Sequence, residues 1–290
     1  MNPLDLIKLR PLMKATRGHP NVVVGVIDGP VDTSHPALQE ARIRAVQGAP
    51  AVHCEQAPSV ACNHGTFVMG MLAAKREGTA PALCPQCNVV ARPVFRQSRK
   101  NAAGMPSSTP QELARAIIET IAAGARVINL SVGLPQSSVV VNRDLDEAFT
   151  YACKRGVMLV VAAGNQGRIG YNPLLAHSWV LPVVACDEQG RPSRASNLSP
   201  SIGKRGLMAP AMHITSTIPG GRYTQMSGTS VAAPFVTGAI ALLWSVFPTV
   251  TAAQIRYAIL AGAAAYRGTI TPPLLDGTAA WTLLKSRHRP

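Results

Sequence analysis

Short apolar runs alternate with stretches of helical spacing over most of this 290-residue chain. The first run, at residues 22–27, is continuously apolar, which is typical of a strand buried on both faces of a sheet. Strands are predicted at residues 22–27, 89–94, 126–131, 157–162 and 179–186, and helices at 64–74, 109–124, 144–155, 230–244 and 251–261. Strands that alternate with helices form parallel sheets. The sequence therefore predicts an α/β, three-layer fold with a mostly parallel central sheet covered by helices on both faces.

The length and composition fit one large domain. Hydrophobic residues make up 47% of the chain and aromatic residues only 4%, so small aliphatic side chains must build the core. No internal repeat, low-complexity tract or linker interrupts the sequence. A chain of this length can bury one large core. We therefore expect a single domain over residues 1–290, with its core at about residues 20–262 and packed or flexible extensions at both ends.

The chain is basic, with 28 Lys and Arg against 14 Asp and Glu and a formal net charge of +14. Such a charge is one mark of nucleic-acid binders. The basic residues are dispersed, however, and few aromatic residues lie among them to stack bases. One cluster stands out: Arg92, Arg96, Arg99 and Lys100. An acidic peptide substrate or simple solubility explains the charge equally well, so we expect no nucleic-acid partner.

No apolar run approaches the roughly 20 residues that a bilayer-spanning helix needs, so we expect no membrane partner. The amino-terminal segment carries Asp5, Lys8 and Arg10 and lacks the continuous apolar core of a secretory signal. The expected location is therefore the cytoplasm. The sequence does not determine the oligomeric state.

Four of the six cysteines flank the helix predicted to start at residue 64. Cys54 and Cys62 precede it, whereas Cys84 and Cys87 follow it. Disulfides, a zinc site and free thiols all remain open for these four. A cytoplasmic location disfavours disulfides, and the unequal spacing, with seven and then two intervening residues, is poor for zinc. The other two cysteines lie in apolar stretches and are predicted to be buried free thiols: Cys153 and Cys186.

Three polar residues stand at the ends of predicted elements. Asp28 ends the first strand, His64 opens a small-residue helix, and Ser230 follows a glycine turn at the start of another helix. The carboxyl ends of parallel strands form the binding edge of α/β proteins, so we expect the three to converge there. A serine hydroxyl becomes a nucleophile when a base accepts its proton, and His64 is suited to be that base. Asp28 would hold the other ring nitrogen, so the three residues predict a catalytic triad for acyl transfer.

A fourth candidate is Asn165, which follows a predicted strand through Ala163 and Gly164. Its side-chain amide and the backbone N–H of Ser230 are suited to donate hydrogen bonds to the oxyanion of a tetrahedral intermediate. Taken alone, Asn165 reads more simply as a turn residue. Together with the triad, it predicts an oxyanion hole.

The motifs around these residues resemble those of subtilisin-type serine proteases over most of residues 20–262. The strand that ends in Asp28 matches, the histidine motif reads HGTFVMG at residues 64–70, and the serine motif reads GTSVAAPFV at residues 228–236. The resemblance implies a subtilisin-like fold and a serine endopeptidase that uses no cofactor. It also implies that an extended peptide pairs with strand-end backbone. The residues implied to bind substrate, with the last two as candidates for the S1 pocket, are Ser131, Val132, Gly133, Ala163, Gly164, Gly170 and Tyr171.

Two departures from the family concern calcium. A carboxylate that ligates calcium in classical members is replaced by Ala37, after the pair His35-Pro36. The calcium loop at the far end of the histidine helix is shortened, since residues 74–81 run straight on. We therefore expect no calcium and no other metal.

The run DGPVD at residues 28–32 and the cysteines beside the histidine helix resemble the proteases that mature cyanobactins. This resemblance implies that the substrate is a precursor peptide or protein and that its leader is removed by hydrolysis. Related macrocyclases carry an insertion between the aspartate and the histidine, whereas here His64 follows Asp28 by 36 residues. A transpeptidating macrocyclase is therefore the second alternative. The first is a pseudoprotease that binds peptides or nucleic acid through its basic surface, for which a broken triad would be the mark, and the triad is intact.

Overall fold

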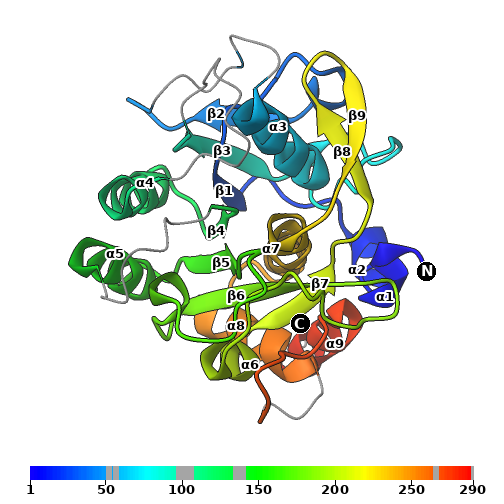
Figure 1. Ribbon diagram of the computed structural model, residues 1–290. Helices are drawn as coiled ribbons and strands as arrows, with labels where there is room; N and C mark the ends of the chain where they lie inside the picture. Colours follow the sequence, from blue (N-terminus) through cyan, green and yellow to red (C-terminus); the bar gives the residue numbers. More distant parts are fainter. Residues whose placement is uncertain (50–53, 55–58, 96–107, 133–141, 264–267, 289–290) are drawn as a thin grey trace.

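The computed structural model describes residues 1–49, 54, 59–95, 108–132, 142–263 and 268–288. Seven parallel strands form the central sheet in the order β2-β3-β1-β4-β5-β6-β7 (Figure 1). They are β1 (Val23–Asp28), β2 (Arg42–Ala45), β3 (Asn88–Pro93), β4 (Val127–Leu130), β5 (Met158–Ala162), β6 (Val180–Cys186) and β7 (Leu207–Pro210). The predicted α/β fold with a parallel central sheet is confirmed. A separate antiparallel hairpin of β8 (Ile214–Ile218) and β9 (Arg222–Met226) was not predicted.

Helices cover both faces of the sheet, as the continuously apolar strands require. The helices on one face are α3 (Val60–Ala73), α7 (Thr229–Val246) and α8 (Ala252–Gly262). Those on the other are α4 (Pro110–Ala122), α5 (Arg143–Lys154) and α6 (Pro200–Arg205). Successive strand residues point to opposite faces, so Val24 and Val26 of β1 enter the first core while Ile27 enters the second. The fold thus has three layers and two hydrophobic cores.

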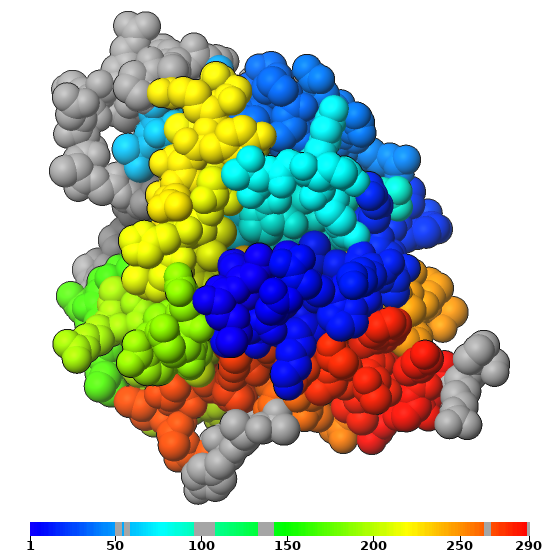
Figure 2. Space-filling view, turned by 90° about the vertical axis from the view of Figure 1, so that its right-hand side faces the viewer, coloured from blue at the N-terminus to red at the C-terminus, as the bar shows by residue number. Residues whose placement is uncertain are grey.

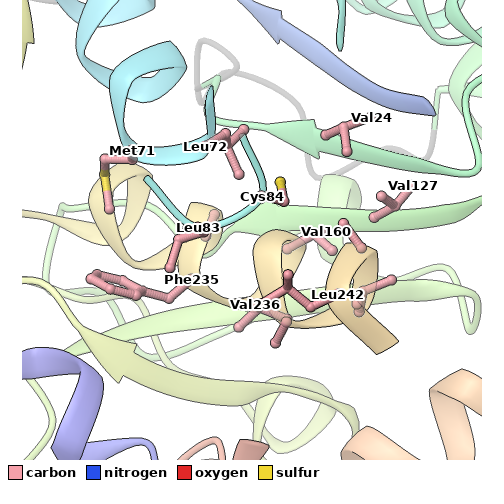
Figure 3. Packing of buried hydrophobic residues seen from close by; sticks show 14 of the residues in the cluster. Val24, Met71, Leu72, Leu83, Cys84, Val127, Val160, Phe235, Val236 and Leu242 are labelled. Carbon is pink, nitrogen blue, oxygen red and sulfur yellow. The ribbon is translucent and has the colours of Figure 1, made fainter. Parts of the chain in front are cut away.

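Helix α7 lies at the centre of the larger core. Its Phe235, Val236 and Leu242 share one cluster with Val127 and Val160 of the sheet (Figure 3). Within the described part of the chain, α7 alone has the length and hydropathy of a membrane span, and 83% of it is buried inside the fold. Its apolar composition is therefore that of a core helix.

The helix starts follow their capping residues. Thr109 accepts a hydrogen bond from the N–H of Glu112 at the start of α4, as its sequence predicts. Helix α3, however, begins at Val60, four residues before its predicted start. Its cap is Ser59, whose hydroxyl accepts from the N–H of Cys62. Ser59, a typical capping residue placed just before the helical stretch, was the sequence signal for this earlier start.

Both chain ends carry helices that pack on the domain. These are α1 (Pro3–Leu6) and α2 (Arg10–Ala15) at the amino end and α9 (Gly277–Arg287) at the carboxyl end. Figure 2 shows the N-terminal residues, in blue, lying against the C-terminal helix, in red. The N–H of Gly277 donates to the carbonyl oxygen of Ile7, which is fully buried. The described extensions are therefore packed.

The four cysteines around α3 divide into two kinds. Cys54 and Cys62 form a disulfide, whereas Cys84 and Cys87 are buried free thiols. The pairing excludes a four-cysteine zinc site, because disulfide sulfurs cannot act as thiolate ligands. Of the three possibilities left open for these cysteines, the first pair thus forms a disulfide and the second pair consists of free thiols.

The prediction that Cys153 is buried is wrong. It lies exposed near the end of α5, whose Phe149 and Ala152 face the core instead. The apolar composition of the stretch misled the prediction, because the helical phase decides which side chains face inward. Cys186, at the end of β6, is buried as predicted, and burial raises the pKa of its thiol to about 12.

Arg92 does not belong to a surface patch. It is 2% exposed and forms ion pairs with Glu112 and Glu119 of α4, at 2.9 and 2.6 Å. The rest of the predicted basic cluster lies outside the described residues: Arg96, Arg99 and Lys100. The two ion pairs of Arg92 join β3 to α4. Because its guanidinium is buried, Arg92 is not accessible to an anionic partner.

Candidate active site

Asp28 and His64 form a buried hydrogen-bonded pair. Asp28 ends β1 and is 1% exposed, and His64, in the first half of α3, is 6% exposed. The Nδ1 of His64 lies 2.7 Å from the Oδ1 of Asp28. Burial alone would lower the pKa of the His64 imidazole, but the Asp28 carboxylate outweighs it and raises that pKa above its ordinary 6.5. The carboxylate thus fixes the ring through Nδ1 and leaves Nε2 as the basic nitrogen.

Two glycines let α3 approach the end of β1 this closely. A Cβ on Gly65 would lie 2.4 Å from the carbonyl oxygens of both Gly29 and Pro30. A Cβ on Gly29 would lie 2.0 Å from the carbonyl oxygen of Ala61. Both contacts are far shorter than van der Waals distance, so only glycine fits at either position. The backbones of the strand end and the helix therefore touch, and this sets the distance between Asp28 and its partner.

The hairpin holds the next turn of α3. The Oγ1 of Thr217 donates to the carbonyl oxygen of Thr66, and the Oγ of Ser216 donates to that of Phe67, each at 2.8 Å. Both β8 hydroxyls are fully buried. Sequence reasoning missed this support, although a Gly-Gly pair between two threonine-containing stretches is a known hairpin signal.

Ser230 lies half-buried in the first turn of α7. The residue before that turn, Gly228, has a φ of +131°, a conformation that favours glycine. The Oγ of Ser131 donates to the carbonyl oxygen of Ser230 at 3.2 Å and accepts from the Nδ2 of Asn129 at 2.8 Å. The end of β4 therefore fixes the start of α7. The hydroxyl of Ser131 supports the helix start, and the contact of Ser131 with substrate stays a prediction.

Asn165 is exposed and lies beside the same helix start. Its Oδ1 accepts hydrogen bonds from the N–H and the Oγ1 of Thr229, at 2.9 and 3.1 Å. A backbone N–H can only donate, so the side-chain oxygen must face Thr229 and Nδ2 must be turned away from it. A Cβ on Gly228 would lie 3.0 Å from that Nδ2. The amide is thus held next to the Gly228 turn in a defined orientation.

The register of the sheet brings together the two halves of the site, the Asp28–His64 pair and the helix start that carries Ser230. Ile27 of β1 pairs with Leu130 of β4, so Asp28 and Ser131 follow at the ends of adjacent strands. Adjacent strands lie about 4.8 Å apart. Since Ser131 bonds to Ser230, the aspartate half and the serine half meet at the carboxyl edge of the sheet.

The other residues predicted to bind substrate differ in exposure. Val132 and Ala163 are buried, so a peptide could reach their backbone rather than their side chains. Gly170 is exposed, and Tyr171 is 57% exposed. Gly133 lies outside the described residues. Contact between these residues and a peptide stays a prediction.

Within the described ranges, no group of three or more His, Cys, Asp or Glu side chains is placed to hold a metal ion. Asp32, the carboxylate nearest to Asp28 in sequence, accepts hydrogen bonds from the N–H groups of Ser34 and Gly220. Partial burial acts to raise the pKa of Asp32, but these hydrogen bonds outweigh it and lower that pKa. Asp32 therefore serves turn geometry between β1 and the hairpin.

Chelation of divalent ions is expected to leave the Tm unchanged, because Ala37 stands where classical subtilisins have a calcium ligand. The measurement is thermal unfolding with and without excess chelator. A fall of several degrees that added calcium reverses would contradict the prediction.

The parallel sheet, the buried Asp–His pair and the serine at a helix start together define a subtilisin-like serine protease. The chain belongs to the subtilase family, whose defining pattern matches residues 19–278. The predicted resemblance is thereby confirmed.

Three relatives illustrate the match. The thermophilic serine proteinase of Bacillus sp. strain AK1 is 34% identical over 232 residues, which cover 79% of this chain and 54% of that protein, so the chain spans about half of this relative. The structure of the protease domain of PatA is 31% identical, with a TM-score of 0.85 and coverage of 94% of this chain and 98% of that one. The structure of the prenylagaramide maturation protease PagA is 27% identical, with a TM-score of 0.84 and coverage of 96% and 98%.

Proposed function

We propose that this chain is a serine endopeptidase in which Ser230 is the nucleophile, His64 the general base and acid, and Asp28 the group that orients His64. The observation that carries the proposal is the buried 2.7 Å contact between His64 Nδ1 and Asp28 Oδ1. A raised imidazole pKa supports it, because the carboxylate stabilises the imidazolium that forms when serine is deprotonated.

In the proposed reaction, His64 Nε2 accepts the proton of Ser230 Oγ as that oxygen attacks the scissile carbonyl carbon. The resulting oxyanion accepts hydrogen bonds from Asn165 Nδ2 and the N–H of Ser230. His64 then gives its proton to the leaving amine, and the acyl-enzyme remains. A water molecule, deprotonated by His64, hydrolyses the acyl-enzyme and restores Ser230. The cycle needs no metal or cofactor.

A fluorophosphonate is expected to label the protein at Ser230 and to leave Ser230→Ala unlabelled, because only a serine activated by a base reacts with it. Intact-mass spectrometry and peptide mapping locate the label. Labelling at a different serine, or equal labelling of the variant, would overturn the nucleophile assignment.

Asn165→Ala is expected to lower kcat by about 10²–10³-fold with little change in KM, because the lost donor acts on charge that develops only in the transition state. Steady-state kinetics on a fluorogenic peptide measure both constants. Full activity in Asn165→Ala would mean that the amide does not serve the oxyanion.

We further propose that the substrate is a ribosomally made precursor peptide from which the leader is removed. Support comes from the likeness to PagA and to a structure of the patellamide maturation protease PatA, together with the sequence separation of 36 positions from Asp28 to His64. Mass spectrometry of products from precursor peptides tests this. Hydrolysis gives two linear fragments, a macrocyclase gives a core lighter by one water, and a pseudoprotease gives intact substrate.

We also propose a cytoplasmic location, against which the Cys54–Cys62 disulfide weighs because disulfides are rare in reducing compartments. Cell fractionation with rapid thiol trapping would measure both the location and the redox state of this pair. Recovery of the protein outside the cytoplasm with the pair oxidised would overturn the proposal.

A further inference from the structure

Asn197 is a buried polar residue that the proposed reaction does not use. It is 5% exposed and lies in the loop that follows β6. That loop is bonded back onto the strand: the N–H of Ser193 donates to the carbonyl oxygen of Ala185, and the N–H of Ala185 donates to the Oγ of Ser196. These hydrogen bonds to β6 therefore fix the position of the loop that carries Asn197.

The side chain of Asn197 uses its full hydrogen-bonding capacity on one segment, the one that carries the proposed oxyanion donor. Its Nδ2 donates to the carbonyl oxygen of Ala163 at 3.1 Å and to the Oε1 of Gln166 at 2.7 Å. Its Oδ1 accepts from the N–H groups of Gln166 and Arg168, at 3.2 and 3.0 Å. The N–H of Asn197 also donates to the carbonyl oxygen of Gly164 at 2.9 Å. Five hydrogen bonds from one residue thus define the path of this segment.

These contacts bracket Asn165. The residue before it, Gly164, bonds to Asn197 through its carbonyl oxygen, and the residue after it, Gln166, bonds through its N–H. Gly164 has a φ of +99°, and a Cβ there would lie 2.4 Å from the Nδ2 of Asn197. Only glycine at position 164 therefore leaves room for the side-chain amide of Asn197, and that amide in turn fixes the Gly164 turn by its hydrogen bonds. Thr229 holds the side chain of Asn165, whereas Asn197 holds the backbone of the residues on either side of it.

We propose that Asn197 is a positioning residue for the oxyanion hole, one that acts through Asn165 and not on the reacting atoms. The inference rests on the proposed function, in which Asn165 donates to the oxyanion. The residue type matters because an aspartate would turn the donor into an acceptor that faces two oxygens, those of Ala163 and Gln166. The segment would then have to move, and a displacement of about 1 Å in a catalytic group can cost about 10²-fold in rate.

Asn197→Asp is expected to lower kcat by roughly 10- to 100-fold and to change KM by less than about 2-fold. In the Asn165→Ala background the same substitution is expected to leave kcat unchanged, because the donor that it positions is already gone. Asn88→Asp is the matched control. It removes a comparable bond, from Asn88 Nδ2 to the carbonyl oxygen of Pro20 at 2.6 Å, at the amino end of β3, and should not alter kcat.

An unchanged kcat in Asn197→Asp, or an equal loss in both backgrounds, would overturn the proposal. Should Asn197→Asp fail to fold, Gly164→Ala reaches the same contact from the other side and is expected to lower kcat. Amide hydrogen exchange at Gln166 and Arg168 in Asn197→Ala separates the two kinds of failure. Suppose that exchange is faster in Asn197→Ala, but that the unmutated protein neither hydrolyses peptides nor reacts with the fluorophosphonate. The proposed function would then be wrong, although Asn197 does hold the segment. Unchanged exchange would overturn the holding contact itself.

Discussion

Asp28→Asn is expected to lower kcat about 10⁴-fold, the loss typical of triad proteases whose aspartate becomes an amide. Asp28 accepts a hydrogen bond from Nδ1 of His64, which keeps the proton on that nitrogen. An asparagine can turn its NH₂ group toward the ring, and the proton then moves to Nε2. In that tautomer His64 cannot accept the proton of Ser230. Stopped assays with long incubation times measure so slow a rate.

The pH dependence of kcat/KM in Asp28→Asn is a second test of the hydrogen bond between residue 28 and His64. In the unmutated protein kcat/KM is expected to fall as the pH drops through the raised pKa of His64, because protonation removes the base. Without the carboxylate only burial acts on the ring, and burial lowers the imidazole pKa. The acid limb of the profile should therefore move to lower pH in Asp28→Asn.

Asp32→Asn is the matched control for this profile. Its carboxylate bonds to Ser34 and Gly220 rather than to His64, so the acid limb should stay in place. An acid limb that moves equally in both variants would mean that long-range charge, and not the 2.7 Å contact, sets the pKa of His64.

Gly65→Ala is expected to lower kcat/KM about 10²-fold and to destabilise the fold by about 1–3 kcal/mol. Its new Cβ would lie 2.4 Å from the carbonyl oxygens of Gly29 and Pro30, so α3 must move by about 1 Å to restore van der Waals distance. That movement stretches the bond between His64 and Asp28. The acid limb should shift toward that of Asp28→Asn, which a purely structural defect would not cause.

Gly78→Ala controls for the general effect of adding a methyl group near α3. The nearest atom to its Cβ would be the carbonyl oxygen of Lys75 at 3.1 Å, so a small adjustment suffices. Activity should be unchanged and stability altered by less than about 1 kcal/mol. Kinetics and thermal unfolding of both variants decide the matter, and a fully active Gly65→Ala would contradict the close-approach argument.

The central strands were predictable because their apolar runs are continuous. The run at residues 22–27 became β1, and its polar end at Asp28 marked the binding edge. The edge strand β2 reads Arg-Ile-Arg-Ala and is exposed at most positions, so it lacks any such run. The hairpin escaped prediction for a similar reason, since its polar Ser216 and Thr217 are buried against α3 by hydrogen bonds rather than by hydrophobicity.

The candidate triad was predictable because each member belongs to a recognisable motif, with Asp28 at the end of β1 and Ser230 at the start of α7. Asn197 was not, because its partners lie 29 to 34 positions earlier in the chain and only the fold brings them together. The same holds for Arg92, whose two glutamate partners come from a separate helix. Long-range polar contacts leave no periodicity in a sequence.

Ser230 is carried by a helix of which 83% is buried in the larger core. Fluctuations that open a terminal helix or an outer loop can leave α7 in place, whereas any opening that releases α7 must break the contact between helix and sheet across five strands. The nucleophile therefore exists only while the cooperative core exists. A copy that has lost its core cannot cut, and its exposed, extended backbone becomes a substrate for copies that remain intact. Loss of activity and loss of the fold therefore depend on the same free energy of unfolding. In this protease, inactivation by heat and self-digestion are expected to begin at the same temperature.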